Sequence, residues 1–471
     1  MQFEEYPNIE FYTLEEDENK IFAEYIVPSN DDISPNVLNL RDIDSPKFSS
    51  FLRLEVIPNM DAKITANDII REVRDYINVR GCEDVIITHM RTAGTLSDEV
   101  VEYALYNKCQ QYVRIDKTGW NIVDTPTYKF VANSMSKPQI KPKRTCKNLL
   151  DLMSPYINAK KDAQILTILW MVQCFLEGNH FALLMSAPSG SGKTVLSNIL
   201  RAVLDPSKTG VSILNTKGDS LLTTLTNSYL VAFDNTRPLD PEESDIMCVS
   251  VTSGVYTKRE AFSTNTNAVF RLHNAIILNG VNILPRESDF AQRCLLLQLE
   301  SITPKTRMLK SELMKKFNND VPEILGAIFD TISKAMTIAD SVELKEKSRM
   351  ADEEKEMTAI AIALGISQEE FKRIYDENRS ELDKARSKTD LFFAVQEYMS
   401  KVNKKSIEGT VSQIYSKICN SYSGGKAELP KSPSQFSRKL SLEYQAFLSA
   451  GIRINLDDTY TDGTHIKIIK K

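Results

Sequence analysis

The chain has 471 residues, with 58 Lys+Arg against 63 Asp+Glu, and its formal net charge is −5. With 42% hydrophobic and 26% charged residues, the composition is that of a globular protein and excludes collagen-like, low-complexity and wholly disordered classes. A chain of this length is expected to form about two to four domains. The sign of the charge excludes a uniformly basic nucleic-acid coat, but it leaves room for local basic sites.

The N-terminus and the cysteines indicate a cytoplasmic protein. The chain begins with the acidic run MQFEE and lacks a cation followed by an apolar core, so we expect no signal peptide. The most apolar stretch, 165–176, is about half as long as a membrane helix, which predicts a buried helix and no membrane partner. The seven cysteines are odd in number and include no CxxC pair, which disfavours both a disulfide framework and a zinc ribbon.

Residues 1–136 are predicted to form an N-terminal α+β accessory domain. The alternating pattern of 51–57 predicts a strand, and the spacing of apolar residues over 67–79 predicts a helix. Further strands are expected at 85–87 and in a meander, which comprises 102–105, 112–115 and 120–123. No catalytic constellation is visible here, and a collar or a nucleic-acid-contacting domain is the alternative interpretation.

Residues 137–146 carry two prolines and clustered cations, which predicts a basic, Pro-containing linker. A solvated tether and a strap that contacts phosphates are both compatible with this composition.

Residues 147–305 are predicted to form the catalytic core. Short, largely apolar runs alternate here with helical patterns, and these runs are 181–185, 211–214, 229–233, 275–278 and 294–299. Strands that are buried on both faces have this composition, so we expect an α/β fold with a parallel sheet wrapped by helices.

Residues 306–387 are helical in pattern and highly charged, which predicts a lid or connector bundle. Ser367 followed by Glu370 is a capping box that should open one of its helices.

Residues 388–471 are predicted to form a winged-helix domain, because three helical patterns precede two strands. The first helix covers 391–399, Thr410 can cap the second, and Ser434 can cap the third, which would end at Gly451. The strands are expected at 452–456 and 465–469, on either side of a polar tip. This segment holds 13 Lys+Arg against 8 Asp+Glu, so a basic tail of +5 accompanies an acidic body of −10.

The strongest chemical signal is the stretch APSGSGKT, residues 187–194, which fits the phosphate-binding loop GxxxxGK[ST] except that Ala187 replaces the first glycine. The residues expected to surround the nucleotide are Pro188, Ser189, Gly190, Ser191, Gly192, Lys193 and Thr194. Small residues let backbone N–H groups surround the phosphates of ATP, Lys193 can reach the β and γ oxygens, and the Thr194 hydroxyl can bind Mg²⁺. A strand precedes the loop and a helix follows it, so the helix dipole faces the nucleotide.

The second signal is the buried strand LVAFD, which ends at Asp234. An Asp at this position, about 40 residues after a phosphate loop, can bind the same Mg²⁺. Asn235 follows where hydrolases of this type usually have Glu, and an amide can orient water without taking its proton. Asp245 could supply the missing carboxylate, although a solvent-facing helix residue is the interpretation that we favour.

Two further residues fit the catalytic chemistry of a ring ATPase. Asn279 ends the strand AIILN, where its amide could lie between the γ-phosphate and Asp234 and position the water. Arg293 lies just before the strand CLLLQL and could project into the nucleotide of a neighbouring subunit. The alternatives are a turn residue for Asn279 and a surface cation for Arg293.

Two groups of cations are candidates for contacts with DNA. Lys258 and Arg259 belong to a predicted hairpin that could present them to a nucleic-acid backbone, and a solvated hairpin tip is the alternative. Arg438 and Lys439, together with Gln435, are expected on the outward face of the third C-terminal helix, where a helix in the major groove needs donors. Winged helices also serve as protein–protein modules.

With these motifs assembled, the chain resembles the AAA+ ATPases of phages and integrated mobile elements, the helicase half of primase–helicase replication proteins. These proteins are akin to superfamily III and MCM-like helicases. The resemblance covers about 105–335, and 434–467 resembles the winged helix that such proteins often carry. It implies a P-loop AAA+ parallel-sheet core, a hexameric ring, ATP hydrolysis and translocation on single-stranded DNA.

The resemblance assigns roles to single residues. Lys193 and Thr194 would contact the nucleotide, Asp234 the metal, Asn279 would be the sensor and Arg293 the finger in trans. We therefore expect an ATP-dependent DNA helicase or replication initiator of a mobile genetic element. A nucleotide-gated DNA-binding scaffold that scarcely hydrolyses ATP is the alternative, because Asn235 departs from the family pattern. A small-molecule kinase fits less well, because kinases rarely add the sensor strand, the arginine segment and a DNA-type tail.

Overall fold

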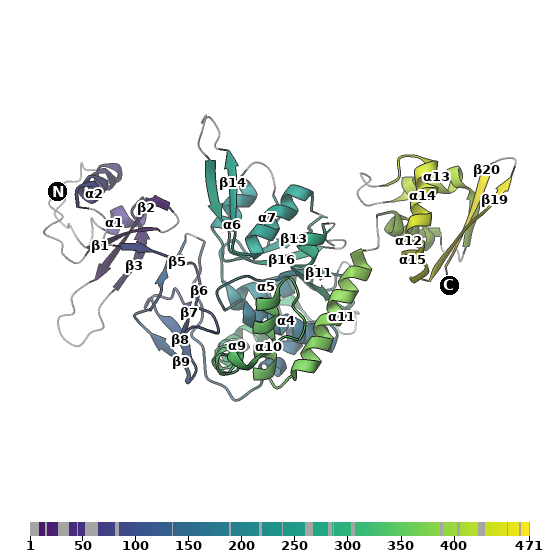
Figure 1. Ribbon diagram of the computed structural model, residues 1–471. Helices are drawn as coiled ribbons and strands as arrows, with labels where there is room; N and C mark the ends of the chain where they lie inside the picture. Colours follow the sequence, from purple (N-terminus) through teal and green to yellow (C-terminus); the bar gives the residue numbers. More distant parts are fainter. Residues whose placement is uncertain are drawn as a thin grey trace. The chain divides into compact units, whose positions relative to one another are not determined.

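The structure is a computed structural model of the whole chain. It describes residues 9–14, 17–26, 37–44, 46–51, 65–80, 84–133, 135–187, 190–215, 219–237, 239–259, 267–280, 285, 287–302, 307–386, 390–402, 406–422, 429–449, 451–460 and 463–470. The chain divides into two compact units, one of Met1–Ile283 with Glu287–Tyr375 and one of Leu284–Arg286 with Asp376–Lys471 (Figure 1).

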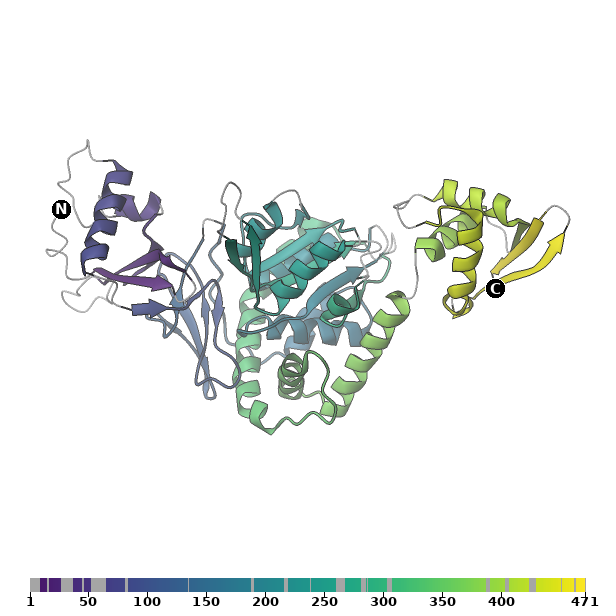
Figure 2. The same ribbon diagram turned by 45° about the horizontal axis from the view of Figure 1, so that its top comes forward.

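The first unit begins with a four-stranded sheet in the order β3-β2-β1-β4. Its elements are β1 (Ile9–Leu14), β2 (Asp17–Ile26), β3 (Val37–Asp42), α1 (Pro46–Phe51), α2 (Ala66–Arg80) and β4 (Asp84–Ile86). Helix α2 lies against this sheet (Figure 2). The ring of Tyr76 on α2 is 6.1 Å from that of Phe11 on β1. The predictions of α2 and of a strand at 85–87 are confirmed. The predicted strand 51–57 is wrong at Phe51, which ends α1 after a proline at its first position, and 52–57 lie outside the described residues.

A second antiparallel sheet has the order β6-β7-β8-β9 and confirms the predicted meander. Its strands are β6 (Thr92–Ala93), β7 (Val101–Ala104), β8 (Tyr112–Asp116) and β9 (Gly119–Val123). The turn between β8 and β9 is held by Asp116, whose Oδ1 accepts a hydrogen bond from the N–H of Thr118 at 2.7 Å. Next to this sheet, β5 (Thr88–His89) and β10 (Lys129–Phe130) pair in parallel.

The five predicted core strands form one parallel sheet in the order β12-β13-β16-β11-β17, which confirms the expected α/β core (Figure 1). The strands are β11 (Ala182–Ser186), β12 (Ser212–Ile213), β13 (Leu230–Asp234), β16 (Ala275–Gly280) and β17 (Cys294–Gln298). The connecting helices are α5 (Lys193–Leu204), α6 (Ser220–Thr226), α7 (Pro241–Val251) and α8 (Ser288–Ala291), and β14 (Val255–Arg259) pairs with β15 (Asn267–Arg271) as a hairpin.

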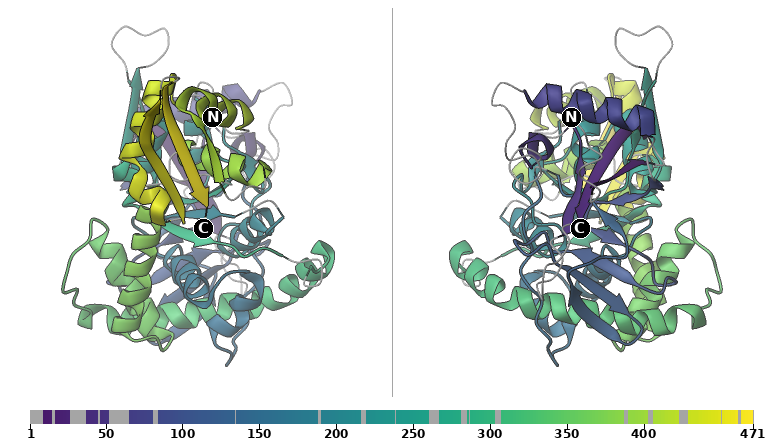
Figure 3. Two further views of the ribbon diagram at one scale, coloured as in Figure 1. Left: turned by 90° about the vertical axis from the view of Figure 1, so that its right-hand side faces the viewer. Right: turned by 90° about the vertical axis from the view of Figure 1, so that its left-hand side faces the viewer.

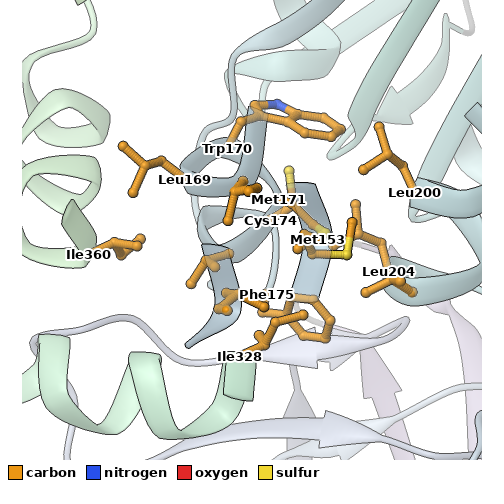
Figure 4. Packing of buried hydrophobic residues seen from close by; sticks show 14 of the residues in the cluster. Met153, Leu169, Trp170, Met171, Cys174, Phe175, Leu200, Leu204, Ile328 and Ile360 are labelled. Carbon is orange, nitrogen blue, oxygen red and sulfur yellow. The ribbon is translucent and has the colours of Figure 1, made fainter. Parts of the chain in front are cut away.

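The apolar stretch near 165–176 is the buried helix α4 (Lys161–Gln173), as predicted. Its residues from Ile165 to Gln173 are buried on every side, and Trp170 donates from Nε1 to the carbonyl of Phe181, next to β11, at 2.7 Å. Figure 4 shows α4 side chains packing among Leu200, Ile328 and Ile360. Within the described residues, no helix combines the length and the apolar character needed to cross a membrane.

The remaining helices of the first unit cover this core. They are α3 (Leu149–Met153), α9 (Lys310–Ile338), α10 (Ala351–Ala363) and α11 (Gln368–Arg386), of which the last ends in the second unit. The predicted cap of α11 is present, because Ser367 Oγ accepts a hydrogen bond from the N–H of Glu370 at 3.2 Å.

The segment 137–146 is bonded along its backbone, unlike a freely solvated tether. Lys137 N–H donates to Pro206 O at 2.9 Å, and Lys143 N–H donates to Pro322 O, inside α9, at 2.8 Å. The approach to α9 is so close that a Cβ added at Gly326 would lie 1.9 Å from Lys143 O, so only glycine fits there.

The second unit has the element order of a winged helix. Its elements are α12 (Asp390–Val402), β18 (Ser406–Thr410), α13 (Val411–Ser421), α14 (Pro433–Leu442), α15 (Tyr444–Ser449), β19 (Ile452–Tyr460) and β20 (Gly463–Lys470). Strands β19 and β20 form the predicted hairpin, and β18, which the sequence did not reveal, pairs with the other side of β20 (Figure 3).

Two helix starts in this unit test the capping predictions. Thr410 caps α13 as predicted, in a capping box with Gln413. The prediction of Ser434 as a cap is wrong, because the cap of α14 is Ser432, which is followed by Pro433 at the first helical position. The single helix expected up to Gly451 is divided into α14 and α15 at Glu443.

Candidate nucleotide-binding site

The candidate site lies where the carboxyl ends of three neighbouring parallel strands meet the N-terminus of α5. In the sheet, β16 separates β11 from β13, and the register pairs Ser186 of β11 with Gly280 of β16. Ligands of open α/β sheets bind at this edge. The loop after β11, the end of β13 at Asp234 and Asn279 on β16 therefore converge at one place.

The described part of the loop contains two glycines with a left-handed backbone. Gly190 has φ +81° and Gly192 has φ +91°, a left-handed conformation that glycine adopts without strain. The Lys193 ammonium donates to Ala187 O at 2.6 Å, so it folds back over the loop. Partial burial lowers the pKa of Lys193, and the carboxylate of Asp234 opposes this shift. Pro188 and Ser189 lie outside the described residues, and Ser191 is buried.

The two groups expected to hold a metal are in direct contact. Thr194 Oγ1 donates to Asp234 Oδ2 at 2.7 Å, although 40 positions separate them in the chain. One hydroxyl and one carboxylate fit Mg²⁺, which usually keeps several waters and takes one or two carboxylates plus substrate phosphates. The described residues include no group of three or more His, Cys, Asp or Glu side chains that could hold a metal ion.

Asn279 is fully buried between the loop helix and the end of β13. Its Nδ2 donates to Ser197 Oγ at 3.0 Å, and its Oδ1 accepts from the N–H of Asn235 at 3.3 Å. Its backbone carbonyl accepts from the N–H of Thr236 at 2.9 Å. Asn279 therefore links α5 to the chain that leaves Asp234, and its expected position beside a γ-phosphate stays a prediction.

Asn235 has a left-handed backbone with φ +50°. Among residues with a side chain, Asn tolerates this conformation best, and other L-residues are strained by it. The conformation lets the Asn235 N–H donate to Asp234 Oδ1 at 2.8 Å. This geometry gives a physical reason for Asn where an acid was expected. Asp245 is exposed on α7.

Arg293 lies away from the loop and is held within its own chain. Its Nη1 donates to Oδ2 of Asp289 at 2.5 Å and to the Asp289 carbonyl at 2.9 Å, and its side chain is only 12% exposed. Cys248 Sγ lies 3.8 Å from the same nitrogen. The same Asp289 carboxylate also pairs with Arg349, whose side chain is 46% exposed. A role of Arg293 in trans would require this pairing to open, and it stays a prediction.

Sequence reasoning missed one cation at the loop, Arg307. A Cβ added at Gly190 would lie 3.6 Å from Arg307 Nη2, and one added at Gly192 would lie 3.4 Å from Ile302. Ile302 and Arg307, which both follow β17 in the chain, therefore lie beside the two glycines of the candidate loop. No periodic pattern marks this segment, and only the presence of a cation shortly after the last strand could have drawn attention to it.

The hairpin predicted to present Lys258 and Arg259 is formed by β14 and β15. Lys258 Nζ lies 2.6 Å from Asp219 Oδ1, just before α6, in an ion pair between two exposed side chains. This pairing and its hydrogen bond raise the pKa of Lys258. Arg259 is the last residue of β14, and the hairpin tip, 260–266, lies outside the described residues.

In the second unit, Arg438 and Lys439 lie on α14, with Lys439 in its last turn. Arg438 and Gln435 are exposed, whereas Lys439 is partly buried. Gln435 Oε1 accepts from the N–H of Lys431 at 3.0 Å, so this amide is engaged at the start of the helix.

Residues 148–379 match the family model described as the actinomycete integrative conjugative element replication protein. No curated protein matches the chain. Among solved structures, the A form apo structure of the NrS-1 C-terminal region aligns with a TM-score of 0.38 and 13% identity, over 98% of this chain and 97% of that one. An apo structure of the same region gives a TM-score of 0.37 and 12% identity, over 98% and 96%. Over residues 148–379, the chain is thus similar to the replication proteins of actinomycete integrative conjugative elements.

Proposed function

We propose that the chain is a P-loop AAA+ ATPase that acts in replication of a mobile genetic element, as a ring-forming cytoplasmic DNA helicase or initiator. The observation that carries this proposal is the 2.7 Å contact between Thr194 and Asp234 at the N-terminus of α5. It joins the end of a phosphate-binding loop to a strand-terminal carboxylate two strands away in the sheet. The match of 148–379 to a family of replication proteins agrees with it.

ATP binding follows from the polarity of the loop. The phosphates lie against the N-terminus of α5, where free N–H groups and the helix dipole favour anions. Lys193 exchanges its bond to Ala187 O for the β and γ oxygens. Thr194 and Asp234 hold Mg²⁺, which neutralises charge on these phosphates. Arg307 adds a second cation beside Gly190 from the same subunit.

Hydrolysis needs a water aligned with the γ-phosphate, and two amides are available for this task. The side chain of Asn235 is exposed beside Asp234, and Asn279 fixes the backbone of Asn235 through its N–H. In this proposal Asn235 orients the water, and a neighbouring subunit's Arg293 stabilises the transition state once it leaves Asp289. The active form is then a homo-oligomer, a hexamer by resemblance.

Contacts with DNA are assigned to two basic places. Lys258 and Arg259 on the hairpin would contact the backbone of single-stranded DNA inside the ring, and Arg438 and Lys439 on α14 would contact duplex DNA at an origin. Lys258 must leave Asp219 to do so, since an ammonium cannot serve both partners fully.

The test is an ATPase assay with and without single-stranded DNA, combined with native mass of the ATP-bound protein. We expect turnover that DNA stimulates, a hexamer with ATP, and a loss of about 100-fold in Lys193→Ala. Lys161→Ala, an exposed lysine on α4, is the matched control and should keep full activity. A folded wild-type protein without ATP turnover under either condition contradicts the motor.

A nucleotide-gated DNA-binding scaffold is the second candidate, and the left-handed Asn235 favours it because the position lacks a carboxylate base. For a scaffold, ATP and a non-hydrolysable analogue should assemble the protein on DNA equally, with turnover near the background. For the motor, the analogue should assemble the ring but arrest it.

A further inference from the structure

The far end of the loop helix α5 is bound by side chains that precede the family-matched range. A helix leaves its last four carbonyls without partners inside the helix. Here Gln139 Nε2 donates to Ala202 O at 3.1 Å and to Val203 O at 2.9 Å, and the Tyr103 hydroxyl donates to Leu204 O at 2.9 Å. The meander and the segment after it therefore cap the helix whose other end carries the phosphate-binding lysine.

Arg91 completes this cap with a fully buried guanidinium. It donates from Nε to Asp205 Oδ1 at 3.0 Å and from Nη2 to Pro206 O at 3.1 Å, just beyond α5. Its Nη1 donates to Ala104 O at 3.1 Å, and its guanidinium lies 4.6 Å from the ring centre of Tyr106. The planar fork of Arg uses several directions at once, which the ammonium of a lysine cannot reproduce.

The carboxylate of Asp205 connects this cap to the metal-binding strand. Its second oxygen, Oδ2, accepts from the N–H of Leu230 at 3.3 Å, and Leu230 is the first residue of β13, which ends at Asp234. Asp205 thus joins the far ends of the two elements whose near ends carry Thr194 and Asp234. Helices and strands of this length behave as rigid rods, so a shift at one end moves the other.

We infer that Arg91 is a positioning residue for the nucleotide site, acting through Asp205 on α5 and β13, and that residues 88–146 are an integral part of the ATPase unit. This inference rests on the proposed function. The N-terminal meander is then a structural component of the nucleotide site. A partner bound to the meander would alter nucleotide affinity through Arg91 and Asp205.

The test compares Arg91→Lys with Arg114→Lys in the full chain. Arg114 lies on β8 of the same sheet and pairs with the buried Glu102 at 2.8 Å, and its other bonds go to Thr125 and Thr127, after β9, and not to α5. We expect Arg91→Lys to lower kcat about tenfold and to raise the Mg²⁺ concentration for half-maximal turnover, because Thr194 and Asp234 lose their spacing. Arg114→Lys should change neither quantity.

A second variant, Gln139→Met, keeps the volume of the side chain and removes the donors to Ala202 and Val203. If Arg91→Lys does not fold, this variant alone tests whether the cap of α5 positions the nucleotide site. It should shift the Mg²⁺ dependence in the same direction. Thermal unfolding shows that each variant is folded at the assay temperature. Folded Arg91→Lys and Gln139→Met proteins with wild-type kcat and Mg²⁺ dependence overturn the positioning role alone. A wild-type protein that neither binds nor hydrolyses ATP overturns the proposed function instead.

Discussion

Replacing Asn235 by Ala and by Gly separates two roles of this residue. Both changes remove the side-chain amide, but only Gly adopts φ +50° without strain. The left-handed conformation costs an ordinary L-residue about 1 kcal/mol or slightly more. Asn235→Ala should therefore lower the free energy of unfolding by about 1 kcal/mol, which in a unit of this size is a shift of roughly 2 °C in Tm. Asn235→Gly should stay within about 0.5 kcal/mol of the wild type.

Turnover gives the second measurement on the same two proteins. If the amide orients the attacking water, both variants lose it, and kcat should fall about tenfold or more in each. If Asn235 contributes to turnover only through its backbone N–H, which donates to Asp234 and Asn279, Asn235→Gly should keep its activity. The assays are denaturant unfolding and steady-state ATP hydrolysis with single-stranded DNA.

The backbone strain and the catalytic role of the Asn235 amide can be contradicted separately. An Asn235→Ala protein as stable as the wild type would refute the argument from backbone strain. An Asn235→Gly protein with wild-type kcat would remove Asn235 from the catalytic residues and leave its side chain a conformational role only.

Three further predictions concern other parts of the chain. Asp219→Asn frees Lys258 from its 2.6 Å ion pair and should raise single-stranded DNA affinity about twofold in fluorescence anisotropy; unchanged affinity in both Asp219→Asn and Lys258→Ala would exclude the hairpin. Burial raises the pKa of Glu356 to about 8 from 4.5, so the fold favours its protonated form. The free energy of unfolding should fall as the pH rises between these values, and Glu356→Gln should flatten that fall in denaturant titrations at several pH values. Arg438→Ala should weaken duplex binding and lower its salt slope by about one unit; an unchanged slope would indicate that α14 does not contact phosphates.

The core sheet could be predicted because four of its five strands, β11, β13, β16 and β17, consist mostly of buried residues. Runs such as 181–185 and 275–278 contain no polar residue to break them, and continuous apolar runs between helices have one common explanation. Strand β18 (Ser406–Thr410) was not predicted, because Ile407 is its only buried hydrophobic residue and one such residue gives no alternating apolar pattern. It forms because β20 offers a free edge, and that edge is a property of the folded unit.

Helix starts were predictable where one residue could serve as the cap. Thr410 has Gln413 three positions later, and the structure has the capping box. At α14, two serines flank Pro433, and the sequence contained the deciding signal, since proline prefers the first helical position and so makes Ser432 the cap. The i, i+4 spacing of Asp289 and Arg293 was also readable as a local ion pair.

The residues of the candidate nucleotide site could be singled out from the sequence because they follow strands directly or lie in one contiguous motif. The residues that support this site could not be predicted, because they lie far apart in the chain and belong to no motif. Arg91 and Asp205 are 114 positions apart, and neither belongs to a pattern. A buried charge is tolerated only when its partner and its remaining hydrogen bonds are supplied by the fold, so such a pair can be recognised only after the meander and α5 have been brought together. The first segment offered no catalytic constellation, yet it caps the helix on which the proposed chemistry depends. Residues that act on a site through a rigid element leave no local trace in the sequence, and here we infer that they extend the functional unit to residues that precede the range 148–379 matched by the family model.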